Sequence, residues 1–273
     1  MQRMQSTRGV AFVDEQNPRQ QSKRAKKTRK AISPPTDPLY SQQWHLPLIK
    51  APEAWQLTRG EGAAVQIIDD GCQWQHADLR EQYDPSLSHN FNEGDKTDPS
   101  PNPQYDYHGT SCSGVAVARN NSVCGVGAAY RARLGGVRLI SGPTDDATEA
   151  EGITVNLQAP AVVRSCSWGP TGKSELKLCA RFFVSHTFLD VDDGKRLEGP
   201  GRVTLMAMEQ AVQEGRGGKG AIWMWAGGNG GDVLDDCNYD GYANSPMTIA
   251  IGAISDHKKQ SYYSEPCAAL IVG

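Results

Sequence analysis

The chain has 273 residues, 38% of them hydrophobic, which is enough to bury the core of one large domain or two small ones. No apolar run approaches the ~20 residues that a membrane-spanning helix needs, and the N-terminus lacks the apolar stretch of a signal peptide. These features exclude a transmembrane chain and leave either a cytosolic protein or a chain whose first part is missing.

Charge is distributed unevenly along the chain. Residues 1–30 hold nine Lys/Arg residues against two acidic ones, a net of +7, whereas the whole chain carries −3, so residues 31–273 carry −10. A basic arm before an acidic body indicates either association within the molecule or a body that binds basic ligands. A solvated tail or a localisation signal explains the arm equally well.

The seven cysteines form no Cys-x-x-Cys pair, which argues against a structural zinc site. Their odd number leaves at least one thiol free or bonded to a partner outside this chain. The cysteines alone do not decide the cellular compartment.

The expected elements alternate between strands and helices. After the basic arm, the Pro-rich residues 31–38 form an extended joint. Helices are predicted at residues 108–118 and 204–213, and residues 84–107 form a long surface loop. Short apolar runs predict strands at residues 63–68, 134–140, 162–167, 221–226 and 248–253. This order predicts an α/β fold with a mostly parallel sheet and helices on both faces, and places the chemistry at the carboxyl ends of the strands.

Three polar motifs lie where such chemistry is expected. Asp69-Asp70-Gly71 follows a strand and either binds a metal or caps a turn. A histidine followed by glycine, as at His108, is often an ordinary helix start, and the glycines around Asn229 form a turn in many proteins. Their order is more informative, because Asp before His is the order of the subtilisin triad, in which the serine comes last.

Longer motifs around these residues resemble the kexin/furin branch of the subtilisin superfamily, the proprotein convertases. The matching motifs follow one another in the same order from about residue 36 to the end of the chain. They are Ile-Ile-Asp-Asp-Gly at 67–71, Tyr-His-Gly-Thr-Ser-Cys-Ser-Gly at 107–114, Ser-Cys-Ser-Trp-Gly-Pro at 165–170, Trp-Ala-Gly-Gly-Asn-Gly-Gly at 225–231, Cys-Asn-Tyr-Asp-Gly-Tyr at 237–242 and Tyr-Ser-Glu-Pro-Cys at 263–267.

The resemblance implies a catalytic role for each of the three polar residues. Asp69 orients His108 and stabilises its imidazolium, and His108 acts first as general base and then as general acid. Asn229 donates its side-chain amide to the oxyanion of the tetrahedral intermediate.

The resemblance also implies cleavage after paired basic residues, which suits the acidic body, because a buried Arg or Lys needs carboxylates in place of water. Asp240 is expected at the floor of the first pocket with Asp192 beside it. Asp70, with Asp106 nearby, faces the second basic side chain. The remaining substrate-binding residues implied are Glu149 and Glu198, for a more distal basic residue, and Ser167, Trp168 and Gly169.

Calcium is the implied cofactor, because the matched ligands are hard oxygen atoms. The tight site uses carboxylates, one amide oxygen and carbonyls of a loop that is one residue shorter than usual in the family. Its implied ligands are Asp37, Asp78, the Asn121 side chain and the carbonyls of Ala118, Val123 and Gly125. A second site near the first pocket uses Asp192, Asp235 and Glu265.

The cysteines match the family as well. Cys237 and Cys267 correspond to a disulfide, Cys124 to a cysteine whose partner lies beyond residue 273, and Cys112 to a free thiol beside the catalytic histidine. A disulfide implies an origin in the secretory pathway, Golgi, endosomal or secreted, with membrane anchoring of a longer protein left open.

The resemblance divides the chain into parts. Residues 1–30 resemble the end of a propeptide with its basic self-cleavage site, after Lys30 or Arg24, and residues 31–273 form a partial catalytic domain. Residues 172–191 are an apolar insertion or a retained intron. The chain is expected to stop before the Gly-Thr-Ser segment of the nucleophile and to lack the β-rich domain that follows in convertases.

The resulting expectation is a calcium-dependent serine endopeptidase that cleaves secreted precursors after Lys-Arg or Arg-Arg, in a form inactive without its serine. The alternative is a pseudoprotease that binds basic peptides or calcium without cutting. The expected partners are basic-site peptides and precursors and the chain's own propeptide, with no nucleic acid.

Overall fold

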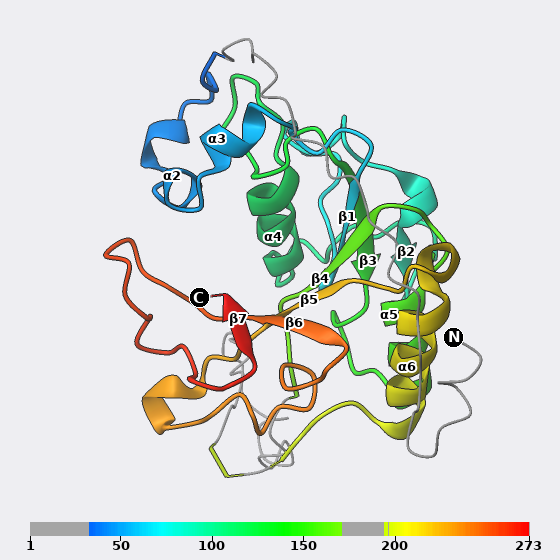
Figure 1. Ribbon diagram of the computed structural model, residues 1–273. Coiled ribbons are helices and arrows are strands. Elements are labelled where there is room, and N and C mark those ends of the chain that lie inside the picture. The colour runs from blue at the N-terminus through cyan, green and yellow to red at the C-terminus, as the bar shows by residue number, and fades with distance from the viewer. Residues whose placement is uncertain (1–32, 171–193, 196, 273) are drawn as a thin grey trace, which may run out of the picture. The chain divides into compact units, whose positions relative to one another are not determined.

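The computed structural model describes residues 33–170, 194–195 and 197–272 (Figure 1). The chain divides into two units, Met1–Ala31 and Ile32–Gly273, and every described residue belongs to the second. The predicted propeptide end at residues 1–30 and the predicted insertion at residues 172–191 therefore lie outside the described residues.

The described residues form one sheet in which every neighbouring pair of strands is parallel. The strand order is β2-β3-β1-β4-β5-β6-β7. The strands are β1 (Ala64–Asp69), β2 (His89–Asn90), β3 (Arg133–Arg138), β4 (Val162–Cys166), β5 (Trp223–Ala226), β6 (Thr248–Ile251) and β7 (Leu270–Val272). The predicted fold class is confirmed, and the carboxyl ends of β1, β4 and β5 lie at one edge of the sheet.

Helices cover both faces of this sheet (Figure 1). The longer ones are α4 (His108–Val117), α5 (Asp146–Thr154) and α6 (Arg202–Gly218). Two neighbouring isoleucines of β1 define the faces, because successive side chains of a strand point to opposite sides. Ile67 packs in a cluster with Val117 of α4, and Ile68 packs in a second cluster with Met208 of α6. Both isoleucines are almost completely buried, as a strand covered on both faces requires.

The N-terminal part of the described chain forms a smaller apolar cluster. It contains the short elements η1 (Tyr40–Gln42), α2 (His45–Leu48) and α3 (Ala51–Trp55). Leu46, Trp55 and Tyr130 are buried together, and the Trp55 indole donates a hydrogen bond to the carbonyl of Ala128. This cluster attaches the segment before β1 to the loop before β3.

The predicted surface loop at residues 84–107 is partly wrong. It contains the 3₁₀ turn η2 (Pro85–Leu87) and the edge strand β2, whose two residues, His89 and Asn90, give no apolar signal in the sequence. The Asn90 amide donates to the carbonyls of Glu93 and Asp95, so a side chain holds the turn after the strand. The remaining 3₁₀ turn, η3 (Gly230–Val233), follows β5. In the described part of the chain, no helix is long and apolar enough to span a bilayer.

The two-faced sheet gives a direct test with a matched pair of isoleucines. Ile68 is 0% exposed and Ile49 is 58% exposed. Ile68→Ala is expected to lower the free energy of unfolding by about 2–5 kcal/mol, because it removes buried methyl groups and leaves a cavity between β1 and α6. Ile49→Ala is expected to change it by less than about 0.5 kcal/mol. Urea unfolding measures both, and equal losses would contradict the packing described.

Candidate active site

An aspartate and a histidine meet at the junction of β1 and α4. Asp69 is the last residue of β1 and is 1% exposed, and His108 is the first residue of α4. The His108 Nδ1 atom lies 2.9 Å from each carboxylate oxygen of Asp69. The backbone carbonyl of Asp69 accepts hydrogen bonds from Leu139 and Ile140, so its backbone is fixed from the sheet side, and Oδ1 of its carboxylate accepts the N–H of Asp70 at 2.8 Å. The His108 side chain is 51% exposed, which leaves the imidazole open to an incoming group.

The surroundings of His108 favour its protonated form. The hydrogen bond to Asp69 is the largest cause that raises the pKa of His108 above its ordinary value, followed by the contact with Cys112, and both outweigh partial burial. The Cys112 sulfur lies 3.8 Å from Nδ1 and 3.9 Å from Nε2. Because these distances are nearly equal, the thiol lies against the imidazole ring and contacts neither nitrogen preferentially. The hydrogen bond to Asp69 therefore orients the ring.

The second aspartate of the motif caps α4. The Asp70 carboxylate accepts hydrogen bonds from the N–H groups of Tyr107, His108 and Gly109, at 3.1, 3.0 and 2.7 Å. Such contacts satisfy the free donors at a helix start and suit its positive dipole end. Burial is the largest cause that raises the pKa of Asp70, and the charge of Asp69 adds to it. A Cβ at Gly109 would lie 2.3 Å from the carbonyl oxygen of Gly71, so only glycine permits this close approach.

The predicted oxyanion residue follows β5. Asn229 is exposed just before η3, after Gly228, whose φ of +88° lies in the region that favours glycine. Strand β4 lies between β1 and β5, and all three are parallel, so their carboxyl ends lie at the same edge of the sheet. This edge therefore carries Asp69, the segment from Ser167 to Gly169, and Asn229. The Trp168 indole donates 2.8 Å to the carbonyl of Ile68, which attaches the segment after β4 to β1.

The acidic residues predicted for the first pocket lie beside that segment. A Cβ at Gly169 would lie 3.4 Å from Oδ2 of Asp240, so this carboxylate borders the chain that leaves β4. Oδ1 of Asp240 accepts the N–H of Tyr242 at 2.7 Å. Glu198 pairs with Asp240 in an isolated parallel bridge. The structure thus brings Gly169, Asp240 and Glu198 together, whereas Asp192 lies outside the described residues.

A tyrosine joins this group to α5. The Tyr242 hydroxyl donates a hydrogen bond to Oε1 of Glu149, and burial raises the pKa of that carboxyl. The Tyr242 ring stacks on Trp225 with centroids 4.6 Å apart and contacts Trp168 edge-on at 5.7 Å. Sequence reasoning assigned no role to Tyr242, although it closes the 237–242 motif that carries Asp240.

Asp106 is held by a cation of the protein itself. Its Oδ2 lies 3.2 Å from Nη2 of Arg138 and also accepts the hydroxyl of Ser141 at 2.5 Å. The Asp106 side chain is 1% exposed. Its negative charge is therefore balanced by Arg138, while the Asp70 carboxylate faces the start of α4.

Two buried carboxylates meet at the predicted tight calcium site. Asp37 and Asp78 are 5% and 4% exposed. Oδ1 of Asp37 accepts the backbone N–H of Asn121 at 2.9 Å, and the Asn121 amide donates to Oδ1 of Asp78 at 2.8 Å. Burial is the largest cause that raises the pKa of Asp37, the charge of Asp78 adds to it, and Oδ2 of Asp37 is buried without a hydrogen-bond partner. An unsatisfied buried oxygen beside a second carboxylate fits a hard divalent cation.

The carbonyl ligands expected for this site belong to the loop after α4. Asn121, Val123 and Gly125 lie in it, and the Val123 N–H donates 2.6 Å to Oδ1 of Asn121. The Ala118 carbonyl accepts the N–H of Gly127 at 2.8 Å and keeps a second lone pair. The loop therefore brings the backbone of Asn121 to Asp37 and its side-chain amide to Asp78.

Two acids of the predicted second calcium site share one glycine. Glu265 is 2% exposed and its Oε1 accepts the N–H of Gly230 at 2.9 Å. The carbonyl of Gly230 accepts the N–H of Asp235, and Oδ2 of Asp235 accepts the N–H of Gly194. The third expected ligand, Asp192, lies outside the described residues.

The predicted disulfide is present. Cys237 and Cys267 are bonded, with Cα atoms 5.3 Å apart and a sequence separation of 30. Cys112 and Cys124 are free cysteines, as are the buried Cys72 and Cys166.

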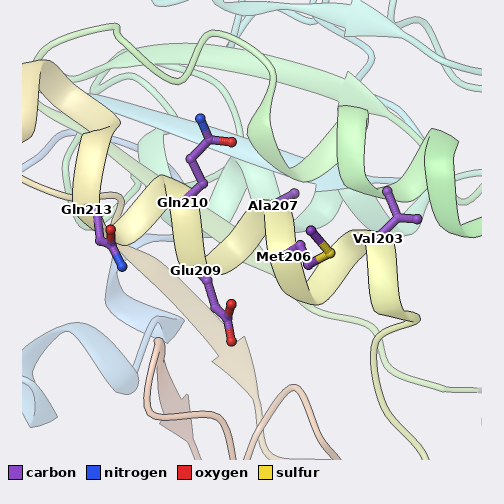
Figure 2. Close-up of a pocket in the computed structure, with 6 residues that line it drawn as sticks. All are labelled: Val203, Met206, Ala207, Glu209, Gln210 and Gln213. Carbon is purple, nitrogen blue, oxygen red and sulfur yellow. The ribbon is translucent and has the colours of Figure 1, made fainter.

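A separate open groove runs along the outer side of α6 (Figure 2). It contains none of the residues predicted for catalysis, substrate or calcium. Val203 and Met206, 51% and 59% exposed, supply its apolar part. Its lining residues are Val203, Met206, Ala207, Glu209, Gln210 and Gln213.

Comparisons with known proteins agree with this geometry. The model of the subtilase family matches residues 60–271. The chain is 37% identical to proprotein convertase subtilisin/kexin type 4 of Homo sapiens, over 92% of this chain and 32% of that protein, and 38% identical to furin of Rattus norvegicus, over 98% and 32%. It spans about a third of the length of these relatives. The solved serine protease of Aeromonas sobria, in complex with its chaperone, matches with a TM-score of 0.67 and 21% identity, over 88% of this chain and 42% of that one. This last likeness shows the fold alone.

The Asp69–His108 pair gives a pH-dependent prediction. Asp69→Asn is expected to lower the pKa of His108 toward about 6.5, because the main cause of its raised value is removed. The stabilisation that the pair contributes is fully present below the unfolded pKa of about 6.5 and is lost as the pH rises through the higher folded pKa. In Asp69→Asn this pH-dependent loss of stability should disappear. An NMR titration of the imidazole measures the midpoint. The control is Asp256→Asn, beside the exposed His257, which should leave the midpoint of His108 unchanged. An unaltered His108 midpoint in Asp69→Asn would contradict the pairing.

Proposed function

Because this chain belongs to the subtilase family, we propose that it forms part of a calcium-dependent serine endopeptidase of the proprotein convertase type, which cleaves after paired basic residues. The observation that carries the proposal is the Asp69–His108 pair at the sheet edge that also presents Asn229 and Asp240. The chain's 37–38% identity to two convertases over most of its length supports the same branch of the family.

In the proposed reaction, His108 removes the proton of the attacking serine and later gives it to the leaving amine. Asp69 holds Nδ1 in the protonated form, so that Nε2 is the basic atom, and stabilises the imidazolium. Asn229 donates to the developing oxyanion, a contact worth about 100- to 1000-fold in kcat where it has been removed in subtilisin.

We place the nucleophile outside the described residues. Within the described ranges, the ring of His108 contacts Asp69 and Cys112, and no serine hydroxyl is bonded to it. The same observation favours the second candidate function, a protein that binds basic peptides or calcium without cutting them.

The proposed specificity rests on carboxylates around the segment after β4. Asp240 receives the first basic side chain, and Glu198 and Glu149 extend the negative surface away from it. Arg and Lys require such compensation when they leave water. Asp70 contributes its charge to the second subsite from its position under the first turn of α4.

We propose that Asp37, Asp78 and Asn121 hold calcium, with the carbonyls of the loop after α4. Bound there, calcium would supply the positive charge that these two buried carboxylates lack. Asp235 and Glu265 form a second site with Asp192.

We further propose that the protein follows the secretory pathway and is kept inactive by its own propeptide. The Cys237–Cys267 disulfide supports an oxidising compartment. Residues 1–30, with nine basic residues, form the end of the propeptide, and their charge suits the acidic pockets after self-cleavage.

Peptide binding tests the proposed specificity. A labelled Arg-Val-Lys-Arg peptide should bind this chain in calcium, and Asp240→Asn should weaken binding roughly 10- to 100-fold, because one charged hydrogen bond is lost. Asp232→Asn, an exposed acid on η3, is the matched control. Equal affinity for an all-alanine peptide would contradict a basic pocket. Cleavage of the labelled peptide by the chain would decide for the endopeptidase and against the second candidate function, binding without cutting.

Calcium removal tests the metal site. Saturating calcium at about 100 times its dissociation constant should raise the free energy of unfolding by about 2.7 kcal/mol. Asp37→Asn should abolish most of this gain, whereas Asp256→Asn, far exposed, should keep it. Differential scanning calorimetry with calcium and with a chelator measures the difference. A gain that survives the combined replacement of Asp37 and Asp78 would place the ion elsewhere.

A further inference from the structure

Asn229 is the one asparagine in the sequence that is followed directly by glycine. This dipeptide is chemically labile, because glycine has no side chain to keep its backbone nitrogen away from the asparagine amide. Attack of that nitrogen on Cγ forms a five-membered succinimide ring, the first step of deamidation. The residue proposed as the oxyanion donor therefore belongs to the dipeptide that deamidates most readily.

Deamidation at this position needs only the chain itself and water. The Gly230 nitrogen bonds to Cγ of Asn229, the bond between Cγ and Nδ2 breaks, and ammonia leaves with the proton that Gly230 loses. Water then opens the ring at either of its two carbonyls, which gives aspartate or isoaspartate at position 229. Since the attacking species is the deprotonated nitrogen, a contact that holds the proton on Gly230 slows the first step.

A glutamate holds this proton in the structure. The N–H of Gly230 donates 2.9 Å to Oε1 of Glu265, and both residues are buried, although Asn229 itself is exposed. A Cβ at Gly228 would collide with the same Oε1, so the carboxylate lies against the backbone on both sides of Asn229. The negative charge of a carboxylate at this distance also disfavours an anionic nitrogen.

The backbone angle of Asn229 is a second obstacle to ring closure. The ring requires the Gly230 nitrogen to lie on the same side of the Cα–C bond as Cβ of Asn229. The ψ angle of Asn229 is 4°, which turns this nitrogen away from Cβ. Rotation about the Cα–C bond moves the N–H of Gly230 and therefore breaks its contact with Glu265. The hydrogen bond thus also holds the backbone in the unreactive conformation.

The segment that carries Glu265 is anchored on both sides along the chain. Before it, the carbonyl of Tyr263 accepts the N–H of Gly231 at 2.9 Å. After it, Cys267 is bonded to Cys237, which is fully buried. The glutamate therefore has a fixed position from which to hold the turn after β5.

A second residue of the candidate site is followed by glycine and shows a similar arrangement. Asp240 precedes Gly241, a dipeptide that forms the same ring with loss of water instead of ammonia. The N–H of Gly241 donates 2.6 Å to the carbonyl of Glu198. In both dipeptides the nitrogen that would attack is therefore held by a neighbouring segment.

We propose that Asn229 and Gly230 form a latent deamidation site and that Glu265 is the residue that keeps it closed. Loss of the contact converts the asparagine into an acid. The consequence for catalysis rests on the proposed function, because an acid at this position has no amide to donate to an oxyanion and repels its charge. The deamidation is measured by mass and does not depend on that function, so the two proposals fail separately.

Peptide mass spectrometry after incubation at mildly alkaline pH tests the proposal, because an amide that becomes an acid changes the mass at one position. The folded chain should deamidate Asn229 at least roughly 10-fold more slowly than the same chain in urea, and this comparison needs no variant. Glu265→Ala should raise the rate in the folded chain roughly 10- to 100-fold, because one hydrogen bond to a charged acceptor no longer has to break. Equal rates in the folded and the urea-unfolded chain overturn the proposal.

Two further variants and an internal reference isolate the hydrogen bond. Glu265→Gln keeps an acceptor and should deamidate Asn229 more slowly than Glu265→Ala, although both lack the charge that the proposed calcium site uses. Glu209→Ala, at an exposed glutamate of α6, is the matched control and should behave as the unaltered chain. Asn244, which precedes a serine, should keep its rate in every variant. Equal rates in the two Glu265 variants, or an equal rise at Asn244, overturn the assignment to Glu265.

Discussion

The structure depends on the junction between the end of β1 and the start of α4, where two consecutive carboxylates face different partners. Asp69 contacts the imidazole of His108, and Asp70 contacts three N–H groups at the beginning of the same helix. One residue thus orients the ring and its neighbour fixes the backbone from which the ring projects. Gly109 is required because the helix approaches the carbonyl of Gly71 within the distance of a Cβ.

The acidic residues of this chain are accommodated in physically different ways. Asp69 is opposed by a histidine, Asp70 by the start of a helix, and Asp106 by Arg138. Among the described residues, Asp37 is opposed by no basic side chain and Asp78 only by Nδ1 of His76, 4.0 Å from its Oδ2, which is why their site fits a cation. A buried charge that the protein leaves uncompensated indicates a ligand.

The sheet could be predicted from the sequence because its central strands are short apolar runs that end at turn residues. Ile67 and Ile68 show the signal of a strand buried on both faces. The edge strand β2 was missed because His89 and Asn90 are held by neighbouring strand β3 and by side-chain hydrogen bonds, which a pattern of polarity does not reveal. The full burial of Arg164 in β4 was missed for a related reason, since a charged residue in a strand normally indicates an exposed position.

The pair of Asp69 and His108 could be predicted because both residues sit in long motifs, whereas the role of Asp70 depended on geometry. A side chain that caps a helix from another element leaves no local signature, since the capping signals of a sequence lie next to the helix start. Tyr242 was missed in the same way. Its hydroxyl bonds to Glu149, far away in sequence, and its N–H bonds to Asp240.

Tyr242 joins residues of the proposed acidic subsites. Its backbone fixes the Asp240 carboxylate, its hydroxyl fixes Glu149, and its ring stacks on Trp225 and contacts Trp168 of the segment after β4. Asp240 and Glu149, the acids proposed for the first and the distal basic side chains, are therefore joined through one residue. A basic group that displaces the tyrosine hydroxyl from Glu149 alters the contacts of the same residue that holds Asp240. Because aromatic stacking resists tilting of the ring, we expect the hydroxyl and the Glu149 carboxylate to move in such an exchange while the contact with Asp240 is kept.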